Sequence, residues 1–246
     1  MTPFAAALDV ALAVAAFIAA HLVLFLSGLF DFLVGRFPSM GIFFANAWPG
    51  LSMVVFVVLV LTARNQTAAF VGLRRPRPIA VLAWTIPTVL ACYVMMLIAV
   101  PSYLLVSGTD VQGMIEERSA FFEELPVLPA WGAILFAMFV GVHEELLFRG
   151  FILARLRALF RSTSAAVAVT TAIFGALHAS QGPIGIVQTG SVGLVLAVVA
   201  VRARSIWPVI VAHGIFDSIG LVLIPFLQDD VFKELINQAD GAASRG

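Results

Sequence analysis

Charged side chains are scarce in this sequence. Asp, Glu, Lys and Arg together make up 11% of the 246 residues, whereas 61% of the residues are hydrophobic. A soluble domain carries roughly 25% charged residues, so the composition excludes an ordinary water-soluble globule and predicts an integral membrane protein surrounded by lipid. The 14 basic residues balance the 14 acidic ones. Because nucleic-acid-binding proteins carry an excess of positive charge, we expect no nucleic acid partner.

Cysteine and internal repeats are also lacking. Cys92 is the single cysteine and lies in an apolar run, which excludes an intramolecular disulfide and a metal cluster built from cysteines. We expect it to be a small core residue. Neither repeats nor heptads are visible in the chain. Many transporters are built from inverted repeats and contain discontinuous helices. Since the sequence shows neither of these two features, it argues against a transporter.

Long apolar runs dominate what is present, and they predict an all-α fold: a polytopic membrane helix bundle of about seven transmembrane helices, give or take one. A helix needs about 20 apolar residues to cross the hydrocarbon core. Since no long polar linker divides the runs, we interpret 1–246 as a single integral membrane domain with a retained N-terminal helix. The predicted spans are Phe4–Phe32, Leu51–Ala63, Ile79–Val106, Pro129–Phe160, Ala165–Ser180, Gly185–Val201 and Ile206–Leu227.

Three more polar segments connect or follow these runs. The stretch Gly35–Pro49 contains Gly, Pro and Asn and is predicted to be a connection, while Pro87 and Pro101 are expected to kink or end the third span. The segment Ser107–Pro129 mixes glutamates with phenylalanines, which favours a short amphipathic helix at the membrane interface. The polar tail 228–246 is predicted to be loose.

Arginines mark one side of the membrane. They follow the second, fourth and sixth spans, whereas the alternate connections are acidic or nearly uncharged. These arginines are Arg64, Arg74, Arg75, Arg77, Arg155, Arg157, Arg161, Arg202 and Arg204. Because positively charged loops stay cytoplasmic, we expect a multi-pass protein of the inner (plasma) membrane with a cytoplasmic N-terminus.

Two adjacent glutamates and an arginine lie inside the fourth run. A charge at the centre of a membrane helix costs about 2.5–3.5 kcal/mol, so charges without a use are rare there. Glu145 and Arg149 are four residues apart and can pair on a helix, while Glu144 is rotated by about 100° and is available for proton transfer. The alternative is an ion pair that only locks the bundle.

Ionisable residues on two further spans are expected to meet this pair. Glu145 precedes Arg161 by 16 residues and His178 follows it by 17, so both lie about 25 Å from the turn between their spans. His213 and Asp217 are four residues apart and share one face of the last span. Three spans that each contribute ionisable groups favour a functional site over a purely structural one.

The neighbouring aromatic and histidine side chains are interpreted as structural. Phe174 lies four residues before His178 and is expected to pack the imidazole into position. His21 is isolated in the first run and is not assigned to the site. His143 is rotated by about 100° from Glu144, on the side opposite Glu145, so at most it flanks the site.

Three motifs in this order resemble those of the CAAX protease and bacteriocin-processing (CPBP, Abi) family of intramembrane proteases, which includes the prenyl-protein (type II CAAX) endopeptidases. The motifs are Glu144-Glu145-x-x-x-Arg149, Phe174-x-x-x-His178 and His213-x-x-x-Asp217. The resemblance covers about 130–225, which it implies to be the catalytic core. The first 128 residues match only in hydropathy and in the loop Gly72-Leu73-Arg74.

The resemblance implies a peptidase and a role for each residue of the motifs. Glu144 would be the general base that activates a water together with His178. Glu145 would pair with Arg149 and orient it. Hydrolysis also needs hydrogen-bond donors where negative charge develops, shielded from bulk solvent, and that role would fall to the last motif.

Asp217 admits two roles within that motif. A charged carboxylate only accepts hydrogen bonds, so Asp217 could be a donor to the oxyanion only if burial keeps it protonated. Alternatively, an ionised Asp217 holds His213 as the donor. The occurrence of Asn at this position in the family favours the first role.

No cofactor is expected, because the family's chemistry is driven by glutamate without a required metal. The alternative is a zinc ion held by Glu144, His178 and His213, with an open position for water. The His-Glu-x-x-His motif of zinc peptidases is incomplete here, because Leu147 stands in place of the second histidine.

The predicted function is therefore an intramembrane endopeptidase, a hydrolase acting on a peptide or protein substrate with a membrane-proximal segment. The alternative, which also follows from the resemblance, is a non-catalytic membrane partner or a bacteriocin-immunity scaffold. A scaffold would be expected to lose motif residues, and this chain keeps all of them.

Overall fold

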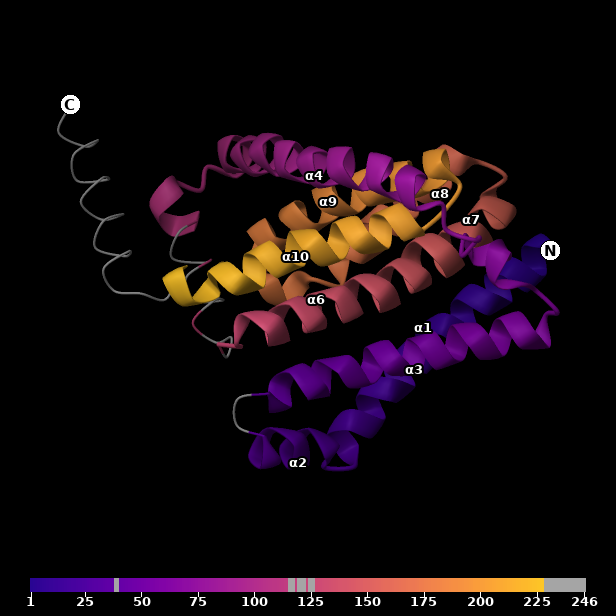
Figure 1. Cartoon of the computed structure of the whole chain (residues 1–246), viewed down its shortest axis with the longest axis horizontal. Coiled ribbons are helices and arrows are strands. Elements are labelled where there is room, and N and C mark those ends of the chain that lie inside the picture. Colours follow the sequence, from indigo (N-terminus) through magenta and orange to yellow (C-terminus); the bar gives the residue numbers. More distant parts are fainter. Residues whose placement is uncertain (38–39, 115–117, 119–122, 124–126, 228–246) are drawn as a thin grey trace.

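The computed structural model describes residues 1–37, 40–114, 118, 123 and 127–227, and every regular element within them is helical. In this part of the chain, five helices are long and apolar enough to cross a membrane. Two shorter apolar helices, Thr163–Ala176 and Trp207–Leu223, lie where the fifth and seventh spans are predicted. Most of them run along the long axis of the molecule (Figure 1). The predicted all-α polytopic membrane bundle is confirmed.

The first apolar run is broken by a turn. α1 (Pro3–Leu26) ends before Gly28, whose φ of 74° is a left-handed conformation that glycine adopts without steric cost. A separate short helix, α2 (Leu29–Arg36), follows and packs against α1 and α3. The prediction of one span over Phe4–Phe32 is therefore wrong at its C-terminal end.

α3 (Gly41–Ala63) begins well before the predicted start at Leu51. Most of the stretch interpreted as a connection is therefore helical. Its polar amide is satisfied within the helix, because Asn46 Nδ2 donates to the Ile42 carbonyl at 2.9 Å. Pro49 also lies inside the helix, a position that membrane spans tolerate better than soluble helices do.

α4 (Pro78–Ser107) matches the predicted third span, and both Pro87 and Pro101 lie inside it rather than at its end. The fourth span is a rod of three consecutive segments: α6 (Ala130–Glu145), η2 (Leu146–Ile152) and α7 (Leu153–Phe160). η2 is π-helical, which means that its turns are wider than those of the α-helices on either side.

The remaining helices complete the bundle. They are α8 (Thr163–Ala176), α9 (Gly182–Ala203) and α10 (Trp207–Leu227), with the short turns η1 (Ala68–Val71) and η3 (Ala179–Gln181) in the connections. α9 and α10 agree closely with the predicted sixth and seventh spans. α8 is shorter than the predicted fifth span, which was expected to continue to Ser180.

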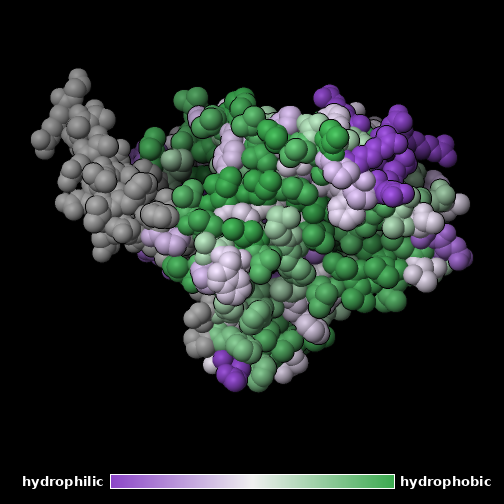
Figure 2. Space-filling model, in the orientation of Figure 1, coloured by the Kyte–Doolittle hydropathy of each residue, from purple (hydrophilic) through white to green (hydrophobic). Residues whose placement is uncertain are grey.

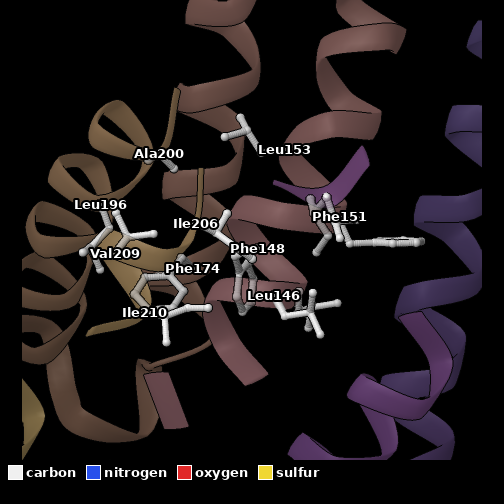
Figure 3. Packing of buried hydrophobic residues seen from close by; sticks show 14 of the residues in the cluster. Leu146, Phe148, Phe151, Leu153, Phe174, Leu196, Ala200, Ile206, Val209 and Ile210 are labelled. Atoms are coloured by element: carbon white, nitrogen blue, oxygen red, sulfur yellow. The ribbon is translucent and has the colours of Figure 1, made fainter. Parts of the chain in front are cut away.

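Apolar side chains of η2, α7, α8, α9 and α10 form the central core (Figure 3). Phe151, Leu196 and Val209 are fully buried in it. The outer surface is also apolar over most of the face seen in Figure 2, and hydrophilic residues gather at one end. Apolar residues on the inside and on the outside are what a lipid environment requires.

A buried acid ties α1 to the rod. Asp9 is fully buried, its Oδ1 accepts a hydrogen bond from Arg64 Nη2 at 2.7 Å, and its Oδ2 lies 3.4 Å from Arg155 Nε. Arg155 also donates to Gln66 Oε1 at 2.8 Å, and its guanidinium lies 3.7 Å from the centre of the Phe151 ring. The prediction that Arg155 belongs to the loop after the fourth span is therefore wrong, because this side chain is fully buried within α7.

Two predicted segments lie partly or wholly outside the described residues. Of the segment 107–129, in which an interfacial helix is predicted, residues 115–117, 119–122 and 124–126 lie outside, as does the whole of the polar tail 228–246.

Candidate active site

Glu145 and Arg149 form an ion pair at the junction of α6 and η2. Arg149 Nη1 lies 2.6 Å from Glu145 Oε1, and neither side chain is exposed. The other end of the guanidinium fork, Nη2, donates to the Gly193 carbonyl of α9 at 3.0 Å. The guanidinium also lies 4.3 Å from the centre of the Phe174 ring. Arg149 therefore joins the rod to α8 and α9 while it holds the carboxylate of Glu145.

His213 of α10 lies among three carboxylates. Its Nδ1 is 2.8 Å from Glu145 Oε1, the same oxygen that Arg149 contacts. Its Nε2 is 3.3 Å from Asp217 Oδ2 and 3.8 Å from Glu144 Oε2. An imidazole can donate hydrogen bonds from both nitrogens only when it is protonated. The arrangement therefore suits a cationic His213 held between Glu145 and Asp217.

Two glycines bring α10 close enough to α6 for these contacts. A Cβ on Gly141 of α6 would lie 2.8 Å from the Ile210 carbonyl and 2.9 Å from the Gly214 backbone nitrogen. A Cβ on Gly214 would meet Met138 in turn. Membrane helices commonly use small residues for such close approach. Because His213 is adjacent to Gly214, the helix contact places its imidazole beside the glutamates.

A cavity of about 540 Å³ adjoins these groups. Glu144, His178, His213 and Asp217 all contribute to its wall, whereas Glu145 is buried behind it. Glu144 Oε2 accepts no hydrogen bond from the described part of the chain. The opposite wall is largely apolar and includes Phe17, Phe43, Met53, Phe136 and Val140. A carboxylate oxygen in such a wall can accept a proton from a molecule in the cavity.

His178 reaches this cavity from the end of α8. The predicted span Ala165–Ser180 implied that His178 lies on a helix. Because α8 ends at Ala176, His178 instead lies in the turn before η3. Its Nδ1 lies 2.8 Å from the Phe174 carbonyl oxygen, which can only accept, so Nδ1 carries the proton. In the neutral ring, Nε2 is then an acceptor. The Phe174 ring packs on the imidazole at 4.8 Å between centres, as predicted.

The Phe-x-x-x-His pattern occurs twice more around the same cavity. His21 Nδ1 lies 2.9 Å from the Phe17 carbonyl, and His143 Nδ1 lies 3.0 Å from the Phe139 carbonyl. Both imidazoles contribute to the cavity wall. Neither histidine was predicted to belong to the site, although the shared spacing to a preceding phenylalanine is a signal that could have grouped all three.

The donors of the alternative zinc site do not come together in the structure. Among the described residues, no group of three or more His, Cys, Asp or Glu side chains is arranged to hold a metal ion. Glu144 Oε2 and His213 Nε2 lie 3.8 Å apart, and the hydrogen bond of His178 Nδ1 to the Phe174 carbonyl leaves its Nε2 as the atom that could bind an ion. That no metal is required stays a prediction.

Comparisons with known proteins give one match. Residues 126–219 match a family model described as type II CAAX prenyl endopeptidase Rce1-like. This segment contains all the residues of the three motifs and nearly coincides with the predicted core 130–225. Searches of the curated proteins and of the solved structures found no match.

Proposed function

We propose that the protein is an intramembrane endopeptidase that hydrolyses a peptide bond with an activated water, as the match of residues 126–219 to the Rce1-like CAAX endopeptidase model suggests. The observation that carries this proposal is the cavity wall in which Glu144, whose buried Oε2 has no hydrogen-bond partner among the described residues, lies beside a histidine held by two carboxylates. An ion pair that served only to lock the bundle would need neither an available acceptor nor a cavity beside it.

Glu144 and His178 would bind the attacking water. Glu144 and His178 both line the cavity, and the Glu144 carboxylate and the Nε2 of a neutral His178 are acceptors, so each can take a hydrogen bond from one water. The water oxygen then forms a bond to the carbonyl carbon of the substrate and gives one proton to Glu144. Glu144 passes this proton to the amide nitrogen as the C–N bond breaks, and the products are a carboxylic acid and an amine.

His213 would stabilise the oxyanion formed in the first step. Donors and positive charge act most strongly where water is excluded, and His213 is only 5% exposed. Its cationic form is supported by Glu145 on one nitrogen and Asp217 on the other. This contact favours the second of the two roles considered for Asp217, in which the ionised carboxylate holds His213.

The cavity suits an extended peptide segment with apolar side chains. Its lining combines the polar groups of the motifs with aromatic and aliphatic residues of α1, α3 and α6. We infer a substrate whose cleaved bond lies close to a membrane-embedded segment, because the site is enclosed by membrane-spanning helices.

Substitution of Glu144 tests the proposal. The purified protein in liposomes would be incubated with a library of peptides that contain an apolar segment, and the products would be identified by mass spectrometry. Glu144→Gln keeps the shape but cannot accept the proton, so cleavage should fall by at least about 100-fold. Asp31→Asn, an exposed substitution on α2, is the control and should cleave as the wild type does.

Two results would contradict the assignment. Cleavage by Glu144→Gln at the wild-type rate would remove this residue from the role of base. A folded wild-type protein that cleaves no peptide of the library would favour the non-catalytic membrane partner.

We further propose that water activation needs no metal ion, because Glu144 and His178 can bind and deprotonate the water themselves. Cleavage should survive prolonged dialysis against a strong chelator, measured with the same peptides before and after treatment. Loss of activity that stoichiometric zinc restores would show instead that a metal takes part.

A further inference from the structure

A second cavity, of about 440 Å³, lies at the arginine-rich end of the molecule. Three arginines from separate parts of the chain line it: Arg74 from the loop before α4, Arg157 from α7, and Arg204 from the end of α9. η2 contributes to both cavities, because it adds Arg149 and Gly150 to this wall and Leu147 and Phe148 to the wall of the candidate active site. The mechanism proposed above uses none of the three lining arginines.

These three arginines have no acidic partner among the described residues. The arginines with an acidic partner in that part of the chain include Arg64, Arg149 and Arg155, and none of the three lining arginines forms such a pair there. Arg157 donates through Nε to the hydroxyl of Thr163 at 3.2 Å, a neutral partner. The described lining of the cavity includes no aspartate or glutamate. The cavity therefore presents three positive charges that nothing in its own wall neutralises.

Backbone contacts fix the loops that carry two of these arginines. The Ile206 N–H donates to the Gly72 carbonyl at 3.2 Å, and Trp207 Nε1 donates to the Arg74 carbonyl at 2.7 Å. Arg204 ends α9 in the left-handed conformation, with φ of 53°. The main chain on both sides of the cavity is thus held in place before any ligand binds, which lowers the entropic cost of binding.

The floor of the cavity is apolar, in contrast to its rim. It is formed by side chains that include Val71, Leu153, Ala200 and Ile206. Figure 2 shows that hydrophilic residues gather at one end of an otherwise apolar surface. A ligand that fits both parts carries negative charge at one end and apolar groups at the other.

We propose that this cavity binds the phosphate group of an anionic ligand, most simply the headgroup of an anionic phospholipid such as phosphatidylglycerol. Arginine is suited to phosphate because its planar fork can donate two parallel hydrogen bonds to phosphate oxygens. Basic pockets between membrane helices on the cytoplasmic side are known to bind phospholipid headgroups. A free phosphate has the same chemistry at its charged end, and experiment can distinguish the two sources.

Thermal unfolding with added ligands tests this proposal on the full chain in a neutral detergent. A short-chain phosphatidylglycerol should raise the Tm of the wild type in a saturable manner, and the matching phosphatidylcholine should not. If inorganic phosphate raises the Tm as much at the same concentration, the site is a phosphate site whose ligand is soluble. A phosphatidylcholine effect equal to that of phosphatidylglycerol would overturn the proposal without the need for any variant.

Two triple variants assign the effect to the cavity. Arg74→Gln, Arg157→Gln and Arg204→Gln together remove the charges of the lining, whereas Arg75→Gln, Arg77→Gln and Arg202→Gln remove the same number of exposed charges outside it. Each lining arginine is worth about fivefold in affinity. The first triple variant should therefore lose saturable binding over the concentrations tested, and the second should keep it. Equal losses in the two would show diffuse charge attraction and overturn the site.

Discussion

At the scale of single residues, the contacts of His213 separate two carboxylates that look alike in the sequence. Glu145 is fully buried and shares one oxygen between His213 and Arg149. Asp217 lines the cavity and contacts the other nitrogen at a longer distance, 3.3 Å. Loss of Glu145 would therefore strand a buried arginine, while loss of Asp217 should change the charge of His213 with less damage to the fold.

We predict that Asp217→Asn retains part of the cleavage activity and that Asp217→Ala loses more. The amide oxygen of Asn can still accept a hydrogen bond from His213 Nε2 but no longer stabilises its positive charge. The measurement is the cleavage rate of both variants, with Tm as the check on folding. If Asn matches the wild type, a charged Asp217 is not needed, and the protonated-donor role gains support.

The sequence allowed the pairing within each motif to be predicted, but not the contacts between motifs. Residues four apart on a helix must lie close together, so Glu145 with Arg149 and His213 with Asp217 followed from the 3.6-residue repeat. The contact between Glu145 and His213 did not, because it depends on how closely α6 approaches α10. His143 was interpreted as structural for the same reason, since nothing in the helix repeat reveals which helix surfaces line a cavity.

At the scale of helices, the spans could be predicted from hydropathy, whereas their ends could not. Gly28, Asn46 and Pro49 are all turn-forming residues in water, yet only Gly28 breaks a helix here. Asn46 satisfies its amide within the helix, and Pro49 is retained within α3. Conversely, α8 stops short of His178 although the apolar run continues. Hydropathy does not distinguish these cases.

We predict that Gly141→Ala abolishes most activity by separating α6 from α10. The added methyl would lie under 3 Å from backbone atoms of α10, which cannot move aside as a side chain can. We expect a loss of about 1–3 kcal/mol in the free energy of unfolding, seen as a lower Tm. Gly132→Ala on the same helix meets only atoms at 3.5 Å or more and is the control. Equal behaviour of the two variants would mean that the helix contact does not position His213.

We also predict that Asp9→Asn destabilises the attachment of α1 to the rod. The substitution leaves the buried Arg155 without its charged partner, and breaking such pairs typically costs about 3–5 kcal/mol. Arg64 is 35% exposed and can turn toward water, so the lower end of this range is expected. Thermal unfolding and limited proteolysis of α1 would be compared with Asp31→Asn, whose carboxylate is exposed. An unchanged Tm would show that the acid is dispensable.

At the scale of the whole molecule, exposed arginines gather at one end of the bundle, which we predict to face the cytoplasm. Arg155 is buried and does not contribute to this group of exposed arginines. The other members are exposed: Arg74, Arg75, Arg77, Arg157, Arg161, Arg202 and Arg204. Orientation in a membrane follows such charges in short loops. The side of the membrane on which each end lies stays a prediction.

Cysteine labelling on intact and inverted membrane vesicles would test that orientation. Arg75 and Asp110 flank α4, whose 30 residues extend over roughly 45 Å. In a Cys92→Ala background, a cysteine at position 75 should react with an impermeant reagent only from the cytoplasmic side, and one at position 110 only from the outside. Reaction of both from the same side would refute the predicted topology.

The π-helical turn of η2 changes the directions in which side chains before and after it point from the rod. In an uninterrupted α-helix, each residue rotates the side-chain direction by about 100° around the helix axis. After the ten steps from Glu145 to Arg155, and with full turns subtracted, the two side chains would differ in direction by about 280°. One residue accommodated in a wider turn reduces this to about 180°. Glu145 and Arg155 can then point to opposite sides, one toward α10 and the other toward Asp9 of α1. The π turn lets one continuous helix serve both the reaction centre and the N-terminal anchor.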